Sequence, residues 1–198
     1  MRRREVRRVR KDRQMRMIPC SYCTREDDGK KSIEGYFAVF GSDYELWPGA
    51  TESVAPTAFE GALEDDIRCL IDHETRLVLG RNRSGTLTLR ADEHGLWGRV
   101  EINEADGDAM NLYARVQRGD VSQCSFGFDI LDEETEYRED GSVHWTIKRV
   151  KLYEVSIVTF PAYRDTSVQA RREDYEKIKE RQAEAFRERC MRRLKKHA

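Results

Sequence analysis

The sequence lacks long hydrophobic runs and lacks the motifs that define several large enzyme classes. No apolar stretch approaches the roughly 20 residues that a transmembrane helix requires. The basic N-terminus is not followed by an apolar segment, so we expect no secretory signal and expect the protein to stay in a cytoplasm. The chain also has no G-x-S-x-G, Walker loop, H-E-x-x-H or dinucleotide fingerprint, which argues against the enzyme classes that these motifs define.

The chain has few cysteines, and their number is odd. The five cysteines are Cys20, Cys23, Cys69, Cys124 and Cys190. An odd count without a secretory signal argues against a disulfide framework. The C-x-x-C of Cys20 and Cys23 has no second cysteine pair or histidine pair to complete a zinc site. We therefore predict two free thiols there and no bound metal.

Charge is abundant but unevenly distributed. The net charge is −1, yet residues 1–16 hold nine Arg and Lys against two acidic residues, and residues 171–198 hold eleven against six. The centre of the chain is therefore acidic. Basic ends of this kind either meet an acidic surface or nucleic acid or are solvated and bind nothing specific, and the sequence leaves both interpretations open.

Hydrophobic alternation and turn residues predict an α+β fold with a mainly antiparallel sheet or barrel and few helices. Strands are expected at 33–40, 67–73, 85–91, 96–102, 121–131 and 143–160, and helices at 57–63 and 106–118. Long loops are expected at 41–59 and 132–142. The chain then divides into a basic flexible arm, a folded domain and a charged helical tail, over residues 1–28, 29–171 and 172–198.

Ser125 is a candidate nucleophile because of its place in the strand predicted at 121–131. Alternation puts Phe126, Phe128 and Ile130 on one face of this strand, and Ser125 and Gly127 on the other. The missing side chain at Gly127 leaves room for the backbone of a substrate. Taken alone, a serine in this setting is more often an ordinary strand residue.

His73 is the best-placed general base among the four histidines. It ends an apolar stripe on the strand predicted at 67–73, where a fixed imidazole can accept a proton from a serine hydroxyl. The other three are expected in a hairpin turn, beside the acidic loop and at the chain's end, and are His94, His144 and His197. This choice rests on elimination, and a structural histidine is the commoner interpretation.

Glu154 interrupts the hydrophobic pattern of the last predicted strand. Leu152, Ser156 and Val158 share its predicted face, so a carboxylate stands where an apolar residue is expected. Burying a carboxylate is costly unless the group is paired or hydrogen-bonded. Glu154 is therefore a candidate for the acid that orients His73 in a serine-protease triad, while a surface Glu on an edge strand remains an equal alternative.

Six short segments follow one another between about residues 33 and 171. They are GYFAVFGS, APTAFEGAL, IRCLIDHETRLVLGR, SGTLTLRADEHGLWGRVEI, RGDVSQCSFGF and LYEVSIVTFPAYRDTSVQAR. In this order and spacing they resemble the tailed-phage prohead protease family, which is related in fold to the herpesvirus assemblins. Each segment is weak evidence alone, whereas all six in order are difficult to obtain by chance.

The resemblance implies a serine endopeptidase with named site residues. His73 and Ser125 match the family's catalytic positions, and the E-V-S segment suggests Glu154 as the third member. The assemblins use a second histidine instead, for which His144 is available, but we prefer Glu154 because His144 is expected in a loop. By similarity to assemblins, the backbone N–H groups that stabilise the oxyanion are expected around Ala162–Arg164. No metal or cofactor is required.

The resemblance also implies substrates, partners and a location. Such enzymes are packed inside the immature capsid in the host cytoplasm, cut the scaffolding segment from the major capsid protein, and usually cut themselves. We therefore expect the major capsid protein, its scaffolding segment and a second copy of this chain as partners, in a homo-oligomer, and no membrane.

Two other functions stay open at this point. The first is a non-catalytic capsid assembly or scaffold factor of the same fold, in which Ser125 is structural. The second is a nucleic-acid-binding protein that uses its basic ends, although the acidic centre counts against it because such domains usually carry a basic face.

Overall fold

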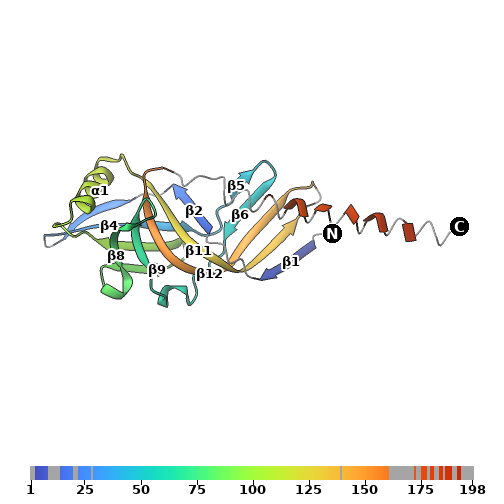
Figure 1. The fold of residues 1–198 in the computed structure, drawn as a ribbon, viewed down its shortest axis with the longest axis horizontal. Helices are drawn as coiled ribbons and strands as arrows, with labels where there is room; N and C mark the ends of the chain where they lie inside the picture. Colours follow the sequence, from blue (N-terminus) through green and yellow to red (C-terminus); the bar gives the residue numbers. More distant parts are fainter. Residues whose placement is uncertain are drawn as a thin grey trace. The chain divides into compact units, whose positions relative to one another are not determined.

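The computed structural model describes most of the chain, and its contacts divide it into two units, Met1–Ala162 and Tyr163–Ala198. The backbone is described for residues 3–8, 14–19, 22–27, 29–138 and 140–160, and for parts of 172–192. The described residues of the second unit are helical. The first unit contains the sheets (Figure 1). Among the described residues, no helix is both long enough and apolar enough to cross a membrane.

Two long antiparallel strands form the centre of an eight-stranded sheet. They are β11 (Gln123–Tyr137) and β12 (Val143–Val158). At the end where the two strands are joined, β1 (Arg3–Arg8) pairs with β11 and β6 (Ala50–Val54) with β12, and β5 (Tyr44–Trp47) pairs with β6. At the other end, β2 (Gln14–Pro19) pairs with β11 and β7 (Arg68–Ile71) with β12, and β8 (Glu74–Arg81) pairs with β7.

A four-stranded antiparallel sheet and one helix complete the first unit. The sheet strands, in order, are β3 (Cys23–Asp27), β4 (Lys30–Val39), β10 (Gly95–Glu101) and β9 (Leu87–Ala91). The helices are α1 (Gly107–Arg118) and two 3-10 turns, η1 (Ala62–Glu64) and η2 (Asn82–Ser84). The α+β class and the antiparallel sheets agree with the sequence prediction.

Aromatic side chains from both sheets meet in a single hydrophobic core. Phe37 of β4 and Phe126 and Phe128 of β11 are almost completely buried in it. The ring of Phe59 lies 5.6 Å from that of Phe126, and Phe126 stacks on Phe128 at 4.7 Å. The Phe126 face of β11 is therefore the core face, which leaves Ser125 and Gly127 on the opposite face, as predicted.

Several segments differ from the sequence prediction. The predicted loop 41–59 contains strands β5 and β6, and the predicted helix 57–63 is reduced to turns and η1. The predicted acidic loop 132–142 is largely strand, because β11 continues through Tyr137. Strands β1, β2 and β3 also lie where the sequence predicts a flexible arm, while the three-part division of the chain stays a prediction.

Backbone pairing with a distant segment explains why the acidic stretch is a strand. Strand β1 pairs antiparallel with β11 in a register that sets residues 3–8 opposite 132–137. A local sequence pattern cannot reveal this because the partner lies more than a hundred residues away.

The cysteines only partly follow the prediction. Cys23 is a free thiol, as expected, and so is the buried Cys69. Cys124 is disulfide-bonded, which the odd cysteine count did not lead us to expect. Cys20 and Cys190 lie outside the described residues.

Helix α1 has the termini that the sequence predicts. Asp106 is the N-cap, and its side chain accepts hydrogen bonds from the backbone N–H groups of Asp108 and Ala109. Gly119 ends the helix in the left-handed conformation at φ 87°. The buried side of the helix presents Leu112 and Val116 to the core.

The cap at Asp106 gives a stability prediction. Replacing it in the Asp106→Ala variant leaves two helix N–H groups without their acceptor and should cost about 1 kcal/mol, a fall of about 3 °C in Tm. Thermal unfolding followed by circular dichroism measures this. The Asp106→Asn variant, which keeps a capping oxygen, should stay near the wild-type Tm, and an equal loss in both variants contradicts the capping role.

Candidate active site

The register of β11 against β12 brings the candidate residues to one face of the sheet. Ser125 stands opposite Ser156, and Gly127 stands opposite Glu154. Directly opposed residues of an antiparallel pair project from the same face. Glu154, Ser156 and Ser125 therefore share the face of the sheet that lies away from the stacked phenylalanines.

A β-bulge in β12 turns Glu154 onto this face. Gly127 pairs with Glu154, but the next residue, Phe128, pairs with Leu152, so that Tyr153 is an extra residue in β12. Leu152 consequently packs with Phe128 in the core. The sequence pattern placed Leu152 and Glu154 on one face, and this was wrong because strict alternation fails at a bulge.

His73 is held by a tight hairpin turn and is not part of a strand. Strand β7 ends at Ile71 and β8 begins at Glu74, which leaves Asp72 and His73 as the two turn residues. Both have positive φ, 49° and 61°. A two-residue hairpin turn needs positive φ at both positions if its twist is to match the twist of the sheet. The predicted strand 67–73 is therefore too long by two residues at its end, and His73 does not continue an apolar stripe.

The side chain of Asp72 fixes this turn against the end of β12. Its carboxylate accepts hydrogen bonds from the backbone N–H and the hydroxyl of Thr159, at 2.6 and 3.0 Å. Its own N–H donates to the carbonyl of Ile157 at 3.0 Å. The turn is thus attached to the strand that carries Glu154, which determines where the imidazole of His73 lies.

A hydrogen-bonded chain runs from His73 to Ser156. His73 Nδ1 lies 2.7 Å from Glu154 Oε1, and the hydroxyl of Ser156 donates to Glu154 Oε2 at 2.6 Å. The side chain of Glu154 is 5% exposed and that of His73 12%. Both carboxylate oxygens are used, which is what a buried carboxylate requires.

Two reactive atoms at this site have no hydrogen-bond partner among the residues that the structure describes. They are Ser125 Oγ and His73 Nε2, and both are buried. Leaving a buried polar atom unsatisfied costs about 1–3 kcal/mol, so such atoms are uncommon and each needs an explanation. A hydroxyl without a partner and an imidazole nitrogen whose ring is already oriented by a carboxylate are the groups that a nucleophile–base pair needs.

His144 does not belong to this site. It lies in β12 and not in a loop as predicted, opposite Glu136 and ten residues before Glu154, which is about 30 Å along an extended strand. Its two ring nitrogens are hydrogen-bonded to the hydroxyls of Thr51 and Ser53, at 2.7 and 2.9 Å. The position of His144 therefore favours Glu154 as the candidate third member. The reason drawn from the sequence, that His144 lies in a loop, was wrong.

Cys69 is the nearest alternative nucleophile, and its surroundings argue against that role. It is completely buried on β7, in register with Val155 of β12. Burial, together with the negative charge of Glu154, raises the pKa of the Cys69 thiol far above its usual value. A thiol that stays protonated is a poor nucleophile.

No metal-binding group of three or more His, Cys, Asp and Glu side chains occurs among the described residues. The oxyanion donors expected around Ala162–Arg164 lie outside them.

A buried serine hydroxyl on the same sheet face as an imidazole–carboxylate pair supplies the groups that serine hydrolases use. The family model of the Caudovirus prohead serine protease matches residues 20–181. The chain therefore belongs to the Caudovirus prohead serine protease family.

Two prohead proteases and one solved structure are similar to parts of the chain. The prohead protease of Enterobacteria phage HK97 is 30% identical over 148 residues, which cover 72% of this chain and 61% of the relative. The prohead protease of Escherichia phage T5 is 32% identical over 98 residues, or 50% of this chain and 42% of the relative. The matched part of the chain thus spans less than two thirds of either relative. The structure of the bacteriophage T4 capsid assembly protease matches 76% of this chain and 99% of its own with a TM-score of 0.46 and 12% identity.

Gly127 provides a test of the site's geometry. A Cβ at this position would lie only 2.3 Å from Glu154 Oε1. In the Gly127→Ala variant the carboxylate must move, which weakens its hydrogen bond to His73 and should cost about 1–3 kcal/mol of stability. The downfield NMR resonance of a proton on His73 Nδ1 should shift or disappear.

The matched control for this test is Gly107→Ala, because a Cβ at Gly107 meets no atom within 4 Å. It should leave both the resonance and the unfolding curve unchanged. An unchanged His73 resonance in Gly127→Ala would show that the carboxylate does not depend on the space at Gly127.

Proposed function

We propose that the chain is a serine endopeptidase that processes capsid and scaffold proteins, and itself, during maturation of a phage prohead. The observation that carries the proposal is the bond between His73 and Glu154 on the sheet face of Ser125, whose buried hydroxyl has no partner. Membership of the prohead protease family supports it.

Each of the three residues has a role in acyl transfer. His73 Nε2 takes the proton of Ser125 as the hydroxyl oxygen attacks a peptide carbonyl, forming the tetrahedral intermediate. Glu154 holds the Nδ1 proton of His73 and stabilises the imidazolium. The imidazolium then gives its proton to the leaving amine, and water hydrolyses the acyl-enzyme. The oxyanion needs preorganised N–H donors, which we assign to the backbone around Ala162–Arg164.

The proposed partners are capsid proteins. The relatives are named prohead proteases, and the T4 neighbour a capsid assembly protease. We assign the major capsid protein with its scaffolding segment as the substrate, a second copy of this chain as the substrate of self-cleavage in a homo-oligomer, and the interior of the immature prohead in the host cell as the place of action.

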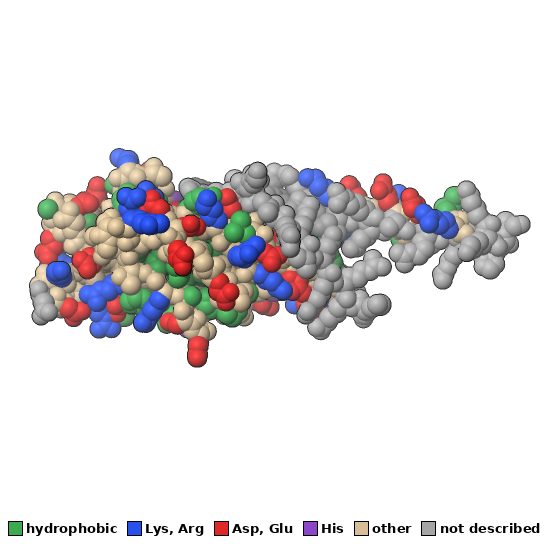
Figure 2. Space-filling view, turned by 90° about the horizontal axis from the view of Figure 1, so that it is seen from below, with side chains coloured by type: hydrophobic (Ala, Val, Ile, Leu, Met, Phe, Trp, Pro, Cys, Tyr) green, Lys and Arg blue, Asp and Glu red, His purple; other side chains and the backbone are tan. Residues whose placement is uncertain are grey.

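The nucleic-acid alternative finds little support on the visible surface. In Figure 2, the Lys and Arg side chains over the first unit are interspersed with Asp and Glu and form no basic face there. A nucleic-acid-binding domain gathers its basic residues on one side. The non-catalytic assembly factor is distinguished by the Ser125 test that follows.

Ser125→Ala tests the catalytic proposal. Co-expression with the major capsid protein, followed by mass measurement of both chains, should show processing by the wild type. In Ser125→Ala, processing should fall by about 10³-fold or more, because the nucleophile is gone. The control is Ser32→Ala: Ser32 is equally buried, and its hydroxyl also lacks a partner, but it lies on β4 in the other sheet. Undiminished processing by Ser125→Ala contradicts a serine protease and favours the non-catalytic assembly factor.

The third member is tested by comparing Glu154→Gln with His144→Gln. Glu154→Gln keeps the shape of the side chain but removes the charge that stabilises the imidazolium, so kcat should fall by about 10²–10⁴-fold. His144→Gln should retain cleavage, because His144 contacts Thr51 and Ser53 and none of the three site residues. The reverse ranking of the two variants would identify His144 as the third member.

A further inference from the structure

Strand β2 lies along the edge of β11 beside Ser125. Residues 14–19 pair antiparallel with 123–128, and Met17 stands opposite Ser125. The two backbones of such a pair are about 5 Å apart. A segment from the N-terminal part of the chain thus passes directly beside the proposed nucleophile.

This edge is where an extended peptide would bind. Proteins that recognise extended peptides commonly add them as a further strand at an open sheet edge, where the backbone gives affinity and side-chain pockets give specificity. With β2 in place, the edge of β11 is occupied, and Ser125 has no exposed surface. A substrate can take this edge only if β2 leaves it.

Arg16 of β2 is held like the side chain of a bound ligand. It is 7% exposed, and its guanidinium makes a two-pronged contact with Glu52 of β6, with Nη2 donating to Oε2 at 2.9 Å and Nε to Oε1. Glu52 is 2% exposed. The contact is thus a buried Arg–carboxylate fork, the strongest and most specific geometry for this pair.

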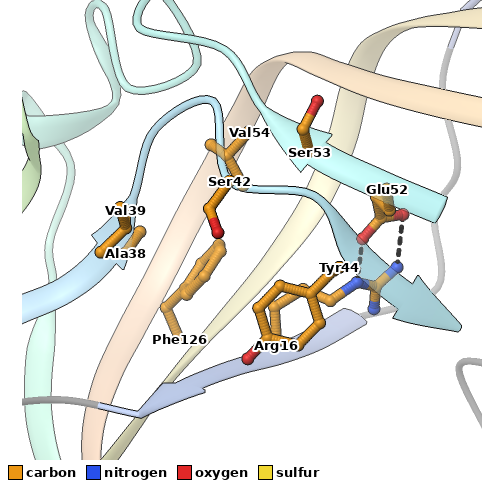
Figure 3. Close-up of a pocket in the computed structure, with 9 residues that line it drawn as sticks. All are labelled: Arg16, Ala38, Val39, Ser42, Tyr44, Glu52, Ser53, Val54 and Phe126. Atoms are coloured by element: carbon orange, nitrogen blue, oxygen red, sulfur yellow. Dashed lines mark hydrogen bonds and ion pairs between the residues drawn. The ribbon is translucent and has the colours of Figure 1, made fainter.

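Aromatic side chains complete the pocket around the guanidinium. The guanidinium carbon of Arg16 lies 5.7 Å from the centre of the Phe128 ring. Tyr44 and Phe126 also line the pocket, and Figure 3 shows the head of Arg16 turned to Glu52. A planar cation fits a buried acid beside an aromatic ring, and arginine suits such a site better than lysine.

We propose that β2 occupies the site of the substrate strand, and that Glu52 selects substrates with an arginine at the position that Arg16 fills. The inference rests on the proposed function and deepens it. Arg16 immediately precedes the residue that faces Ser125, so the selected arginine stands one residue before the residue that faces the nucleophile. In this arrangement β2 also inhibits the enzyme, because it must be displaced before cleavage.

The first experiment measures selectivity. The full-length chain is incubated with a library of synthetic decapeptides, and the cleaved products are identified by mass spectrometry. The wild type should enrich arginine over glutamine by about 10-fold or more at one fixed position near the cleaved bond, and Glu52→Gln should reduce this preference to about 2-fold or less. The control is Glu34→Gln, which removes the carboxylate of another Arg–Glu pair, that of Arg25 and Glu34, in the other sheet.

The second experiment measures inhibition by β2. Arg16→Gln loosens the strand, so kcat/KM for the best decapeptide of the library should rise several-fold, whereas Arg25→Gln should not change it. Because Arg16→Gln leaves Glu52 without this partner and can impair folding, Arg16→Lys is measured in parallel. It keeps the charge but loses the fork, and should give a smaller rise. Circular dichroism confirms that each variant is folded.

The outcomes separate this inference from the function on which it rests. If the wild type cleaves and Ser125→Ala does not, but Glu52→Gln keeps the full preference for arginine, the pocket proposal is overturned and the protease stands. Unchanged kcat/KM in both Arg16 variants overturns the inhibitory role of β2. Cleavage by Ser125→Ala, or no cleavage by the wild type and the Arg16 variants alike, contradicts the proposed function itself.

Discussion

A buried carboxylate imposes the constraint on which the site's geometry depends. Glu154 is 4% exposed, and an unpaired carboxylate in such a position would be strongly destabilising. It is accommodated because His73 binds one oxygen, Ser156 binds the other, and Gly127 leaves the space that the carboxyl group fills. Three separate segments must therefore come together before the acid is satisfied, so folding and assembly of the site are one event.

The hairpin turn that carries His73 is strained, and the surrounding contacts hold it. Two adjacent non-glycine residues with positive φ cost about 1–2 kcal/mol each. Asp tolerates this conformation better than most residues, and the carboxylate of Asp72 gains two hydrogen bonds from Thr159 in the same geometry. The bond from His73 to Glu154 opposes the remaining strain. Glycine in place of His73 would relax the turn, but Glu154 would then lose the imidazole that binds it.

Sequence reasoning selected three residues that the structure brings to one face of the sheet, but it misjudged why they lie there. Ser125 could be assigned to a face because β11 alternates regularly from Gln123 to Gly127, and α1 could be bounded because its caps are local. The face of Glu154 depended on a bulge at Tyr153, which alternation cannot show. The strand at 132–137 depended on backbone pairing with residues 3–8 at the beginning of the chain. What failed in each case was a long-range pairing or an irregularity of register, whereas family resemblance supplied the link between segments that spacing alone left open.

The same physical rule connects the face of Ser125 with the pocket on the opposite face of the sheet. Each contains a buried acid that must have a cationic or hydrogen-bonding partner, Glu154 with His73 and Glu52 with Arg16. On the face of Ser125 the partner is fixed by a hairpin turn, so the pair is permanent. At the pocket the partner comes from a strand held at an edge, so it can be exchanged. A peptide without arginine that displaces β2 removes the two-pronged contact between Glu52 and Arg16 and replaces it with nothing. A peptide with arginine at the same position forms that contact again. The difference in binding free energy between the two peptides gives the selectivity.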